Sequence, residues 1–571
     1  MTISNFLRTN KNNLLSGMAV SGAFVSTILI FAPSQVFLTN PREFNCSYIG
    51  LIGILILGAS LIFIMLFIVN LLVKNRDANQ HFVSILLGIT FLLWIQGNLL
   101  IWNYGLLTGG EITGNIVFII VDTIVWINLI AIFWLKFKYF AKNAVFLSCL
   151  LIAVQIVSIS ILGYQQRNNL SYSQYEFDYT NEYTFSRRQN VIVLVLDSFE
   201  SAAFQEIIDE DSSYQDIFNG FTYFPDTLSG FPHTMASIPN ILTGQYYDNS
   251  IPFTTYLEQA YDSSLSLPKT LKEDGFEVDC FPNWFQEMVP CDEGVVSNIR
   301  PKSLFESARI KRIWEVSLFR YAPDLFKGKI YNDGRWLIQD PSPNEQSGAS
   351  SPTSSFFNNK ELTINDLAFA DGMMRLATTT DARIFKFFRL DGCHGPYLLN
   401  EDLEYEKMPV DDVSYMRQAK GSLQVVDIFL QSLKQRGVFD NSLIVIIGDH
   451  GRPRYNTYLD GYRYANPLLL IKLMNSYDEM QISRTPVSSS SIPATVFSEL
   501  GFKITTEKLS VFESDESAYS SRIFYDYAFD REYWMRDYLP TIKEYVVSGP
   551  VREKESWQLS GREFEAGASG N

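Results

Sequence analysis

The order of hydrophobic and polar positions divides the chain into two parts. In the first 163 residues, five apolar runs each approach the roughly 20 residues that a helix needs to cross the hydrocarbon core of a bilayer. The runs lie at residues 14–37, 48–73, 82–102, 114–135 and 144–163. The pattern therefore predicts a membrane domain of five transmembrane helices over residues 1–163.

Basic residues in the short loops predict the orientation of these helices, because cytoplasmic loops are enriched in Lys and Arg. They precede the first run and follow the second and fourth runs: Arg8, Lys11, Lys74, Arg76, Lys136, Lys138 and Lys142. The opposite loops carry only Arg42, offset by Glu43, and no Lys or Arg between Asn103 and Thr113. We therefore expect the chain after residue 163 to lie outside the cytoplasm.

Two polar features interrupt or border the membrane half. Asp122 lies within the fourth run, where a carboxylate is costly in lipid, so contact with a lipid headgroup or with a partner on a neighbouring helix is expected. Residues 164–190 are polar and aromatic without a sustained period. They predict a connector, and their tyrosines suit either a position along the headgroups or a plain linker.

The remaining residues alternate between strand and helix patterns and predict an α/β domain over 191–550, followed by a C-terminal tail over 551–571. Unbroken aliphatic runs at 191–196 and 443–447 are typical of strands in the middle of a mostly parallel sheet. A Ser-, Pro- and Gly-rich segment at 328–359 predicts a surface insertion or mobile loop. Other expected strands are 277–281, 383–388 and 467–473, and expected helices are 265–273, 364–377, 413–435 and 492–500.

Charge and cysteine content exclude some classes of protein. The net charge of −16 argues against a nucleic-acid partner, because phosphate binding requires a basic face. Five cysteines are too few for a disulfide scaffold, and no CxxC spacing indicates a structural zinc site. Cys280 and Cys291 are close in sequence in a segment expected outside the cytoplasm, so a disulfide and two buried thiols are both open.

Both central strands end in residue types that bind metal ions. Asp197 follows the first strand, and Asp449 and His450 follow the second. In open α/β sheets, sites form at the carboxyl ends of strands, and Asp and His are ligands for Zn²⁺ or Mn²⁺. An Asp after a strand is also a common turn former, but the chain has only four histidines, and three of them lie in short Gly- or Pro-containing motifs: His233, His394 and His450.

Residues 233–244, His-Thr-Met-Ala-Ser-Ile-Pro-Asn-Ile-Leu-Thr-Gly, carry the strongest signal. They resemble the sulfatase signature, in which the nucleophile begins a helix and a Thr-Gly pair closes it. Thr234 stands at the nucleophile position. A hydroxyl there faces unpaired N–H groups and the positive end of the helix dipole, which favour an alkoxide and a bound phosphate. Taken by itself, Thr234 or Ser237 capping the helix would explain the pattern equally well.

The order of the motifs along nearly the whole chain resembles the membrane-bound branch of the alkaline phosphatase and sulfatase superfamily. That branch includes the lipid A phosphoethanolamine transferases and the lipoteichoic acid synthases, which transfer phosphoglycerol. The motifs are Asp197 after a strand, Thr234 at a helix start, Gly-Cys-His-Gly-Pro at 392–396 and Gly-Asp-His-Gly at 448–451. The resemblance implies a multi-pass protein of the bacterial inner (plasma) membrane, with its catalytic domain on the periplasmic or extracellular side.

The resemblance also implies a cofactor and roles for individual residues. One divalent metal ion, Zn²⁺ or Mn²⁺, would be bound by Asp197, Thr234, Asp449 and His450. His394 would hold the substrate phosphate or protonate the leaving group.

Two departures from the family pattern bear on these roles. The first ligand is Asp197 where the transferases usually have Glu, and no histidine follows His450 where they place a second substrate histidine. Arg452 or Arg454 is a candidate for binding the phosphate instead, since a guanidinium is a planar donor.

The implied activity is phosphotransfer. A phospholipid headgroup, phosphoethanolamine or phosphoglycerol, would pass through a phospho-threonine at Thr234 to an envelope glycan or lipid, with His394 as acid and then as base or phosphate clamp. Coordination to a dication would lower the pKa of the Thr234 hydroxyl. Threonine cannot become formylglycine, so sulfate-ester hydrolysis by that route is not expected. The alternatives are a phosphoester hydrolase and a catalytically silent lipid-binding relative.

Overall fold

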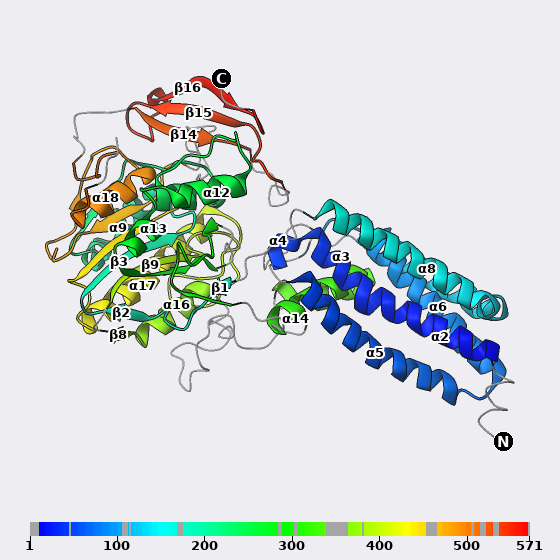
Figure 1. The fold of residues 1–571 in the computed structure, drawn as a ribbon. Coiled ribbons are helices and arrows are strands. Elements are labelled where there is room, and N and C mark those ends of the chain that lie inside the picture. The colour runs from blue at the N-terminus through cyan, green and yellow to red at the C-terminus, as the bar shows by residue number, and fades with distance from the viewer. Residues whose placement is uncertain are drawn as a thin grey trace. The chain divides into compact units, whose positions relative to one another are not determined.

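The chain folds into two compact units (Figure 1). The computed structural model describes residues 11–44, 47–104, 112, 116–167, 175–283, 288–301, 307–334, 336–337, 364–379, 382–452, 465–503, 508–513, 521–528 and 536–568. Unit 1 comprises Met1–Gln174 and Pro301–Asp340. Unit 2 comprises Tyr175–Arg300 and Pro341–Asn571.

Among the described residues, unit 1 contains five helices that are long and apolar enough to cross a membrane. The first is built from α2 (Lys11–Val25), a π-helical turn η1 (Ser26–Phe31) and α3 (Ala32–Thr39), and a short α4 (Pro41–Phe44) follows. The others are α5 (Tyr48–Leu72), α6 (Arg76–Asn98), α7 (Ile116–Leu135) and α8 (Phe137–Gln165). The prediction of five candidate transmembrane helices is confirmed.

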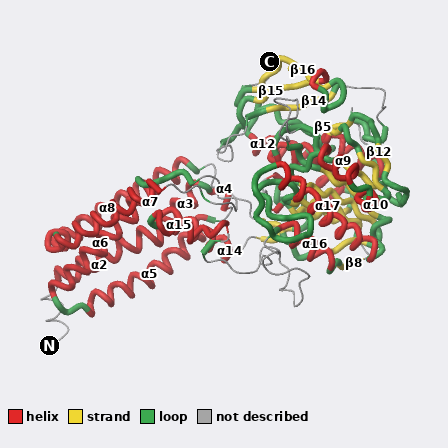
Figure 2. Tube along the Cα trace, turned by 180° about the vertical axis from the view of Figure 1, so that it is seen from behind, coloured by secondary structure: helices red, strands yellow, loops and turns green. Residues whose placement is uncertain are grey.

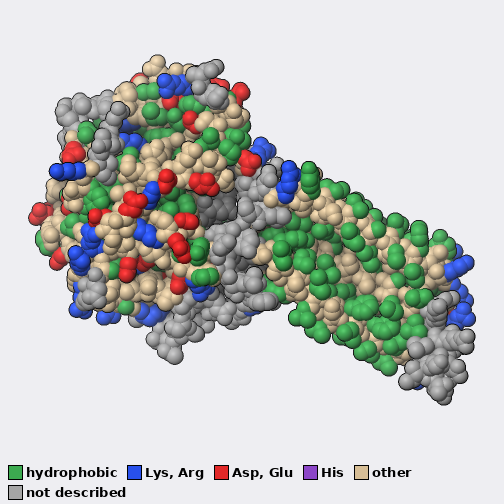
Figure 3. All heavy atoms as spheres, in the orientation of Figure 1, with side chains coloured by type: hydrophobic (Ala, Val, Ile, Leu, Met, Phe, Trp, Pro, Cys, Tyr) green, Lys and Arg blue, Asp and Glu red, His purple; other side chains and the backbone are tan. Residues whose placement is uncertain are grey.

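The surface and interior of unit 1 both suit a lipid environment. On the face shown in Figure 3, hydrophobic side chains cover the length of the bundle, and Lys and Arg gather at the end that carries the N-terminus. Inside, polar side chains bond between helices: Gln155 of α8 accepts from Ser26 at 3.0 Å and donates to Thr27 at 2.6 Å. Such hydrogen bonds are a common means of joining helices where lipid gives no hydrophobic driving force.

Unit 1 also contains two helices from a part of the sequence assigned above to the α/β domain. They are α14 (Ser307–Tyr321) and α15 (Asp324–Tyr331), followed by a 3₁₀ turn η3 (Asn332–Gly334). The predicted loop at 328–359 is therefore wrong at its start, since Ile330 and Tyr331 of α15 are buried against Phe319 and Tyr104. The remainder of that loop from residue 338 lies outside the described residues.

The core of unit 2 is a mixed, mostly parallel sheet with the strand order β12-β4-β11-β10-β3-β9-β6. Strands β10, β3, β9 and β6 run parallel to one another, whereas β11 is antiparallel to β10 and to β4. This confirms the predicted sheet. The strands are β12 (Gln481–Ile482), β4 (Phe221–Tyr223), β11 (Leu469–Lys472), β10 (Ser442–Ile447), β3 (Gln189–Leu196), β9 (Arg383–Leu390) and β6 (Phe276–Phe281).

Both faces of this sheet are covered by helices, shown in red around the yellow strands in Figure 2. Alternate residues of β3 enter opposite cores, Val191 and Val193 one and Ile192 and Leu194 the other, which explains the unbroken apolar run. Residues of α11 (Thr234–Thr243), α12 (Phe253–Asp262), α13 (Leu267–Glu273) and α18 (Ile492–Glu499) line the first core. Residues of α9 (Ser201–Glu210), α16 (Asn365–Met374) and α17 (Asp412–Gln435) line the second, and α10 (Ser213–Ile217) follows α9.

Smaller sheets correct two predicted boundaries. Residues 557–564 of the predicted tail form a strand, β16, because Trp557 is buried against Phe524 and Tyr545 of neighbouring strands. The predicted connector over 164–190 is too long at both ends. Helix α8 continues to Gln165, and β1, β2 and the start of β3, which belong to unit 2, lie between residues 175 and 190. The small sheets pair β1 (Tyr175–Phe177) with β7 (Ile299–Pro301), β2 (Thr184–Ser186) with β8 (Ala377–Thr379), β5 (Thr227–Leu228) with β13 (Val487–Ser488), and β15 (Ile542–Val547) with both β14 (Arg522–Asp526) and β16 (Trp557–Phe564).

Within the described chain, no disulfide joins Cys280 and Cys291. Of the two alternatives left open by the sequence, the structure has the separate thiols, and the Cys280 thiol is buried.

Candidate metal centre

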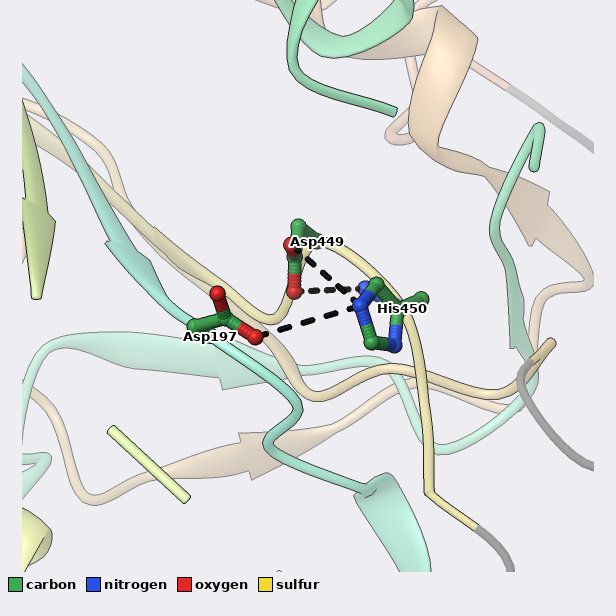
Figure 4. Close-up of side chains that lie close together, drawn as sticks. All are labelled: Asp197, Asp449 and His450. Atoms are coloured by element: carbon green, nitrogen blue, oxygen red, sulfur yellow. Dashed lines mark hydrogen bonds and ion pairs between the residues drawn. The ribbon is translucent and has the colours of Figure 1, made fainter. Parts of the chain in front are cut away.

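The parallel register brings the predicted ligands to one edge of the sheet. Ile447 of β10 lies opposite Val195 of β3, so both strands end at the same level. Asp197 follows β3, and Asp449 and His450 follow β10. Figure 4 shows these three side chains pointing toward one another. All three are buried, and one ligand atom from each lies within 4.8 Å of the others.

Thr234 completes this cluster from the first turn of α11. Its Oγ1 lies 3.3 Å from Asp197 Oδ2 and 3.4 Å from His450 Nε2. His450 Nε2 in turn lies 3.5 Å from Asp449 Oδ2 and 3.8 Å from Asp197 Oδ1. The structure thus brings together the four residues that the sequence proposed as ligands, around a shared centre.

Thr234 is fixed in position by α11, because every residue of this helix is buried and packed against its surroundings. Ser237 Oγ donates to the Phe231 carbonyl at 3.0 Å and fixes the loop before the helix. Asn240 accepts from Ser489 at 3.1 Å, and a Cβ on Gly230 would lie 2.3 Å from Asn240 Oδ1, so a larger residue at 230 would displace the Asn240 side chain.

Backbone contacts orient the other ligands and leave their outer atoms available. His450 Nδ1 donates to the Gly451 carbonyl at 2.9 Å, so Nε2 presents its lone pair to the cluster. Asp449 Oδ1 accepts from the N–H groups of Ser198 and His450, both at 2.9 Å. Asp449 Oδ2 is buried and has no hydrogen-bond partner among the described residues. A cation would satisfy this oxygen, and the donor set suits Zn²⁺ or Mn²⁺, so the residues fit the implied metal.

Arg389 is a charged neighbour of the cluster that the sequence did not indicate. It is the second-last residue of β9, is 2 % exposed, and forms ion pairs with Asp197 Oδ2 and, at 3.1 Å, with Asp391 Oδ1. Burial raises the pKa of Asp197, but the charges of Arg389, followed by His394 and His450, together outweigh burial and hold this pKa below its usual range. Burial and the charge of Asp197 raise the pKa of Asp449. Arg389 is therefore the largest of the contributions that keep Asp197 ionised in a buried site.

The loop that carries His394 is bonded to the end of β3. The Cys393 N–H donates to the Asp197 carbonyl at 2.8 Å. Asp366 accepts the N–H groups of Asp391 at 2.7 Å and Gly392 at 2.9 Å, and Gln418 donates to the His394 carbonyl at 3.1 Å. His394 itself is exposed at this edge, beside the buried cluster.

The other candidate residues lie near the cluster or outside the described residues. The Arg452 guanidinium lies 5.1 Å from the Tyr397 ring and beside Gly395, and hence against the His394 loop. Arg454 lies outside the described residues. His233 precedes Thr234, and its ring is 6.2 Å from that of His450 and 5.1 Å from that of Tyr527. Burial, with a smaller contribution from His450, lowers the pKa of His233 to about 3.

The α/β sheet thus gathers Asp, His and a helix-initial hydroxyl at one edge, where they form a candidate metal centre. The sulfatase family model matches residues 189–501, more than half of the chain. The chain belongs to the sulfatase family. The resemblance to the alkaline phosphatase and sulfatase superfamily is therefore confirmed.

Several solved structures are similar to the chain at low identity. The phosphonate monoester hydrolase SpPMH from Silicibacter pomeroyi is 12% identical, with a TM-score of 0.41, over 64% of this chain and 87% of that one. A protein in the alkaline phosphatase superfamily from Vibrio parahaemolyticus is 12% identical, with a TM-score of 0.37, over 66% and 83%. The C-terminal periplasmic domain of EcEptC from Escherichia coli, in complex with Zn, is 11% identical, with a TM-score of 0.35, over 62% and 92%. No curated protein sequence matches the chain.

Proposed function

We propose that this protein is a metal-dependent phosphotransferase that moves a phospholipid headgroup, phosphoethanolamine or phosphoglycerol, to a hydroxyl of an envelope glycan or lipid. The observation that carries the proposal is the position of the Thr234 hydroxyl, 3.3 Å from Asp197 and 3.4 Å from His450 at the start of a buried helix. One divalent ion, Zn²⁺ or Mn²⁺, would be held by Asp197, Thr234, Asp449 and His450. When bound, it would supply the positive charge that lowers the pKa of a nearby hydroxyl.

In the first step, the Thr234 oxygen attacks the phosphorus of the headgroup after its proton has passed to solvent. The bond from phosphorus to the diacylglycerol oxygen breaks as the bond to Thr234 forms, and His394 donates a proton to the departing oxygen. The exposed position of His394 at the rim of the buried cluster suits a group that meets the leaving group.

In the second step, the acceptor hydroxyl gives its proton to His394 and attacks the phospho-threonine. The bond between phosphorus and the acceptor forms while the bond to Thr234 breaks, and Thr234 recovers a proton from solvent. The two proton transfers at His394 cancel, so the residue returns to its starting state.

The protein's own groups would stabilise charge on the phosphate. The first turn of α11 presents backbone N–H groups and the positive end of the helix dipole toward Thr234. Arg452 lies beside the His394 loop and, with Arg454, is proposed to bind the phosphate oxygens. Thr234 also argues against sulfate-ester hydrolysis through formylglycine, since threonine is not its precursor.

The membrane half supports a donor that resides in a bilayer. Five candidate transmembrane helices in the same chain would keep the α/β unit beside its lipid substrate. We propose that the protein lies in the bacterial inner membrane with this unit on the periplasmic or extracellular side, where envelope acceptors occur and nucleic acid does not.

The test is diacylglycerol release by the purified full chain from vesicles of phosphatidylethanolamine or phosphatidylglycerol, with Zn²⁺ or Mn²⁺ added. Thr234→Ala should lower the rate at least about 10³-fold, as expected for loss of a nucleophile. Thr254→Ala, at an exposed position of α12, is the matched control. Release that needs a hydroxylated acceptor supports transfer. Release with water as sole acceptor would indicate a hydrolase, and no release from either lipid would contradict the proposal.

A further inference from the structure

Helices α14 and α15 belong to unit 1 although the chain enters them from unit 2. The chain leaves unit 2 at β7 and returns to it before α16. Between these points α14 lies beside α3 at the end of the bundle away from the N-terminus (Figure 1). Because α15 likewise contacts α7, the pair is an added part of the membrane bundle.

An apolar face of α14 is buried in the bundle. Ile313 is fully buried, and it packs in one cluster with Leu51 and Leu55 of α5 and with Val36 and Phe37 of α3. Ile159 and Leu162 of α8 contact the same cluster. These contacts join α14 to the first, second and fifth candidate transmembrane helices.

Tyr321 at the end of α14 packs between α3, in the first candidate transmembrane helix, and α6, the third. Its hydroxyl donates to Gln35 Oε1 of α3 at 2.6 Å and accepts from Asn98 of α6 at 3.5 Å. A Cβ on Gly97 would lie 2.5 Å from the Tyr321 ring, so the ring sits where α6 has no side chain. The neighbouring Arg320 donates from Nε to the Gly97 carbonyl at 2.9 Å.

A buried charged cluster joins α15 to α7. Asp122 Oδ2 accepts the backbone N–H of Asp324 at 2.7 Å, and the Tyr104 hydroxyl donates to the Asp324 carboxylate. Lys327 Nζ lies 4.9 Å from the Tyr104 ring centre and donates to the Arg320 carbonyl at 3.3 Å. Asp122 is 1 % exposed and Lys327 2 % exposed. The carboxylate inside the fourth span thus has a partner from a helix far along the chain.

The side of α15 that faces away from this cluster exposes apolar side chains to the surroundings. Leu325 and Phe326 are 61 % and 49 % exposed, next to a helix, α7, whose own first turns expose Ile116 and Ile120. This continuity with the apolar surface of the bundle fits contact with lipid acyl chains.

We propose that Ser307–Tyr331, here named the clamp, is a second membrane attachment of unit 2, held by Tyr321 and by the cluster of Asp122, Asp324 and Lys327. The clamp is tied closely to unit 2, because only residues 302–306 separate α14 from β7, and a chain of that length spans at most about 20 Å. β7 pairs with β1, which receives the other connection from α8, and Arg300 bonds Glu176 at 2.8 Å across the pair. Two short connections at one strand pair would thus each attach unit 2 to the membrane bundle.

The test places a site-specific protease sequence within residues 168–174 of the full chain in vesicles and cuts it to completion. The fragment that begins after the cut retains the clamp but no transmembrane helix. It should sediment with the vesicles if the clamp holds it to the bundle. Recovery of the folded fragment in the supernatant, with its thermal unfolding transition intact, would overturn the proposal.

Two variants separate the clamp from non-specific adsorption of the fragment to lipid. Asp122→Asn alters only the bundle fragment and keeps the side-chain volume, and Lys327→Ala alters only the released fragment. Each should raise the released fraction at least fivefold, whereas Lys329→Ala, at an exposed position of the same helix, should leave it unchanged. Equal retention in Asp122→Asn, Lys327→Ala and the unmodified sequence would contradict the proposed lock. This outcome is independent of any phosphotransfer activity.

Discussion

Glu182 is an acid held in the interior of unit 2 without a full set of partners. It is 7 % exposed, and in the described structure its Oε2 makes no hydrogen bond. Lys386, a buried cation whose charge acts on Glu182, already donates to Asp279 at 2.9 Å and to the Asn181 carbonyl at 2.7 Å. Burial raises the pKa of Glu182 to about 7, and a hydrogen bond with Tyr183 and the charge of Lys386 oppose this rise only in part.

This pKa predicts a pH-dependent effect of Glu182→Gln. The unfolded chain loses the Glu182 proton near pH 4.5 and the folded chain near pH 7, so the free energy of unfolding falls as pH rises between these values. The loss reaches about 3 kcal/mol for a shift of this size. Because Gln stays neutral, Glu182→Gln should gain that amount relative to the unmodified protein between pH 4.5 and pH 8, measured by denaturant unfolding.

Glu258→Gln, at an exposed position of α12, controls for the loss of one acidic charge. The same stability difference for Glu182→Gln at both pH values would contradict a raised pKa at this site.

At the scale of elements, the candidate site depends on how the loop after β9 meets the end of β3. Gly392 has φ of +54°, and a Cβ there would lie 2.7 Å from the Asp197 backbone nitrogen. No rotation of a side chain relieves a clash between Cβ and backbone. The two segments can therefore approach this closely only with glycine at the contact.

Gly392→Ala should separate the His394 loop from Asp197. The expected cost combines left-handed strain of about 1 kcal/mol with the clash, and we expect about 3 kcal/mol in total, with weaker Zn²⁺ binding. Gly437→Ala is the matched control, since Gly437 has φ of +68° but open space around its Cβ position. Thermal unfolding and metal titration of both variants measure the difference, and equal losses in the two would show that the loop contact is unimportant.

Elements buried on both sides are the best predicted from sequence. Residues 191–196 and 443–447 fall within β3 and β10, because a strand with helices on both faces needs apolar residues at every position. The candidate site benefits from this, since its ligands directly follow such strands. Arg389 is different: its partner Asp197 lies 192 residues away, and only the register of β3 with β9 brings them together.

At the scale of the whole molecule, the sequence analysis predicts neither α14 and α15 nor the unit to which these helices belong. The pattern of α14 is that of any helix with one apolar face, and nothing local indicates that Ile313 packs against α5 and α8. The same holds for 557–564, where burial of Trp557 depends on strands from 522–526 and 542–547. Assignments of this kind need contacts between distant parts of the chain.

The proposed orientation can be tested by cysteine labelling in a variant whose five native cysteines are replaced. Ser560→Cys on β16 and Asp77→Cys at the start of α6 are both exposed. A membrane-impermeant maleimide should label position 560 in intact cells, after removal of any outer barrier, and position 77 only after permeabilisation. The reverse pattern would place unit 2 in the cytoplasm and exclude an envelope acceptor.

The central claim is that the Thr234 hydroxyl attacks phosphorus with the help of one divalent ion. The most direct measurement is the mass of the peptide that contains Thr234, after the metal-loaded full chain has been mixed with phospholipid vesicles and quenched in acid. The account predicts a headgroup-phosphate adduct on Thr234 that requires the metal and disappears when an acceptor is added. An unmodified Thr234 during active turnover, or an adduct on another residue, would contradict it.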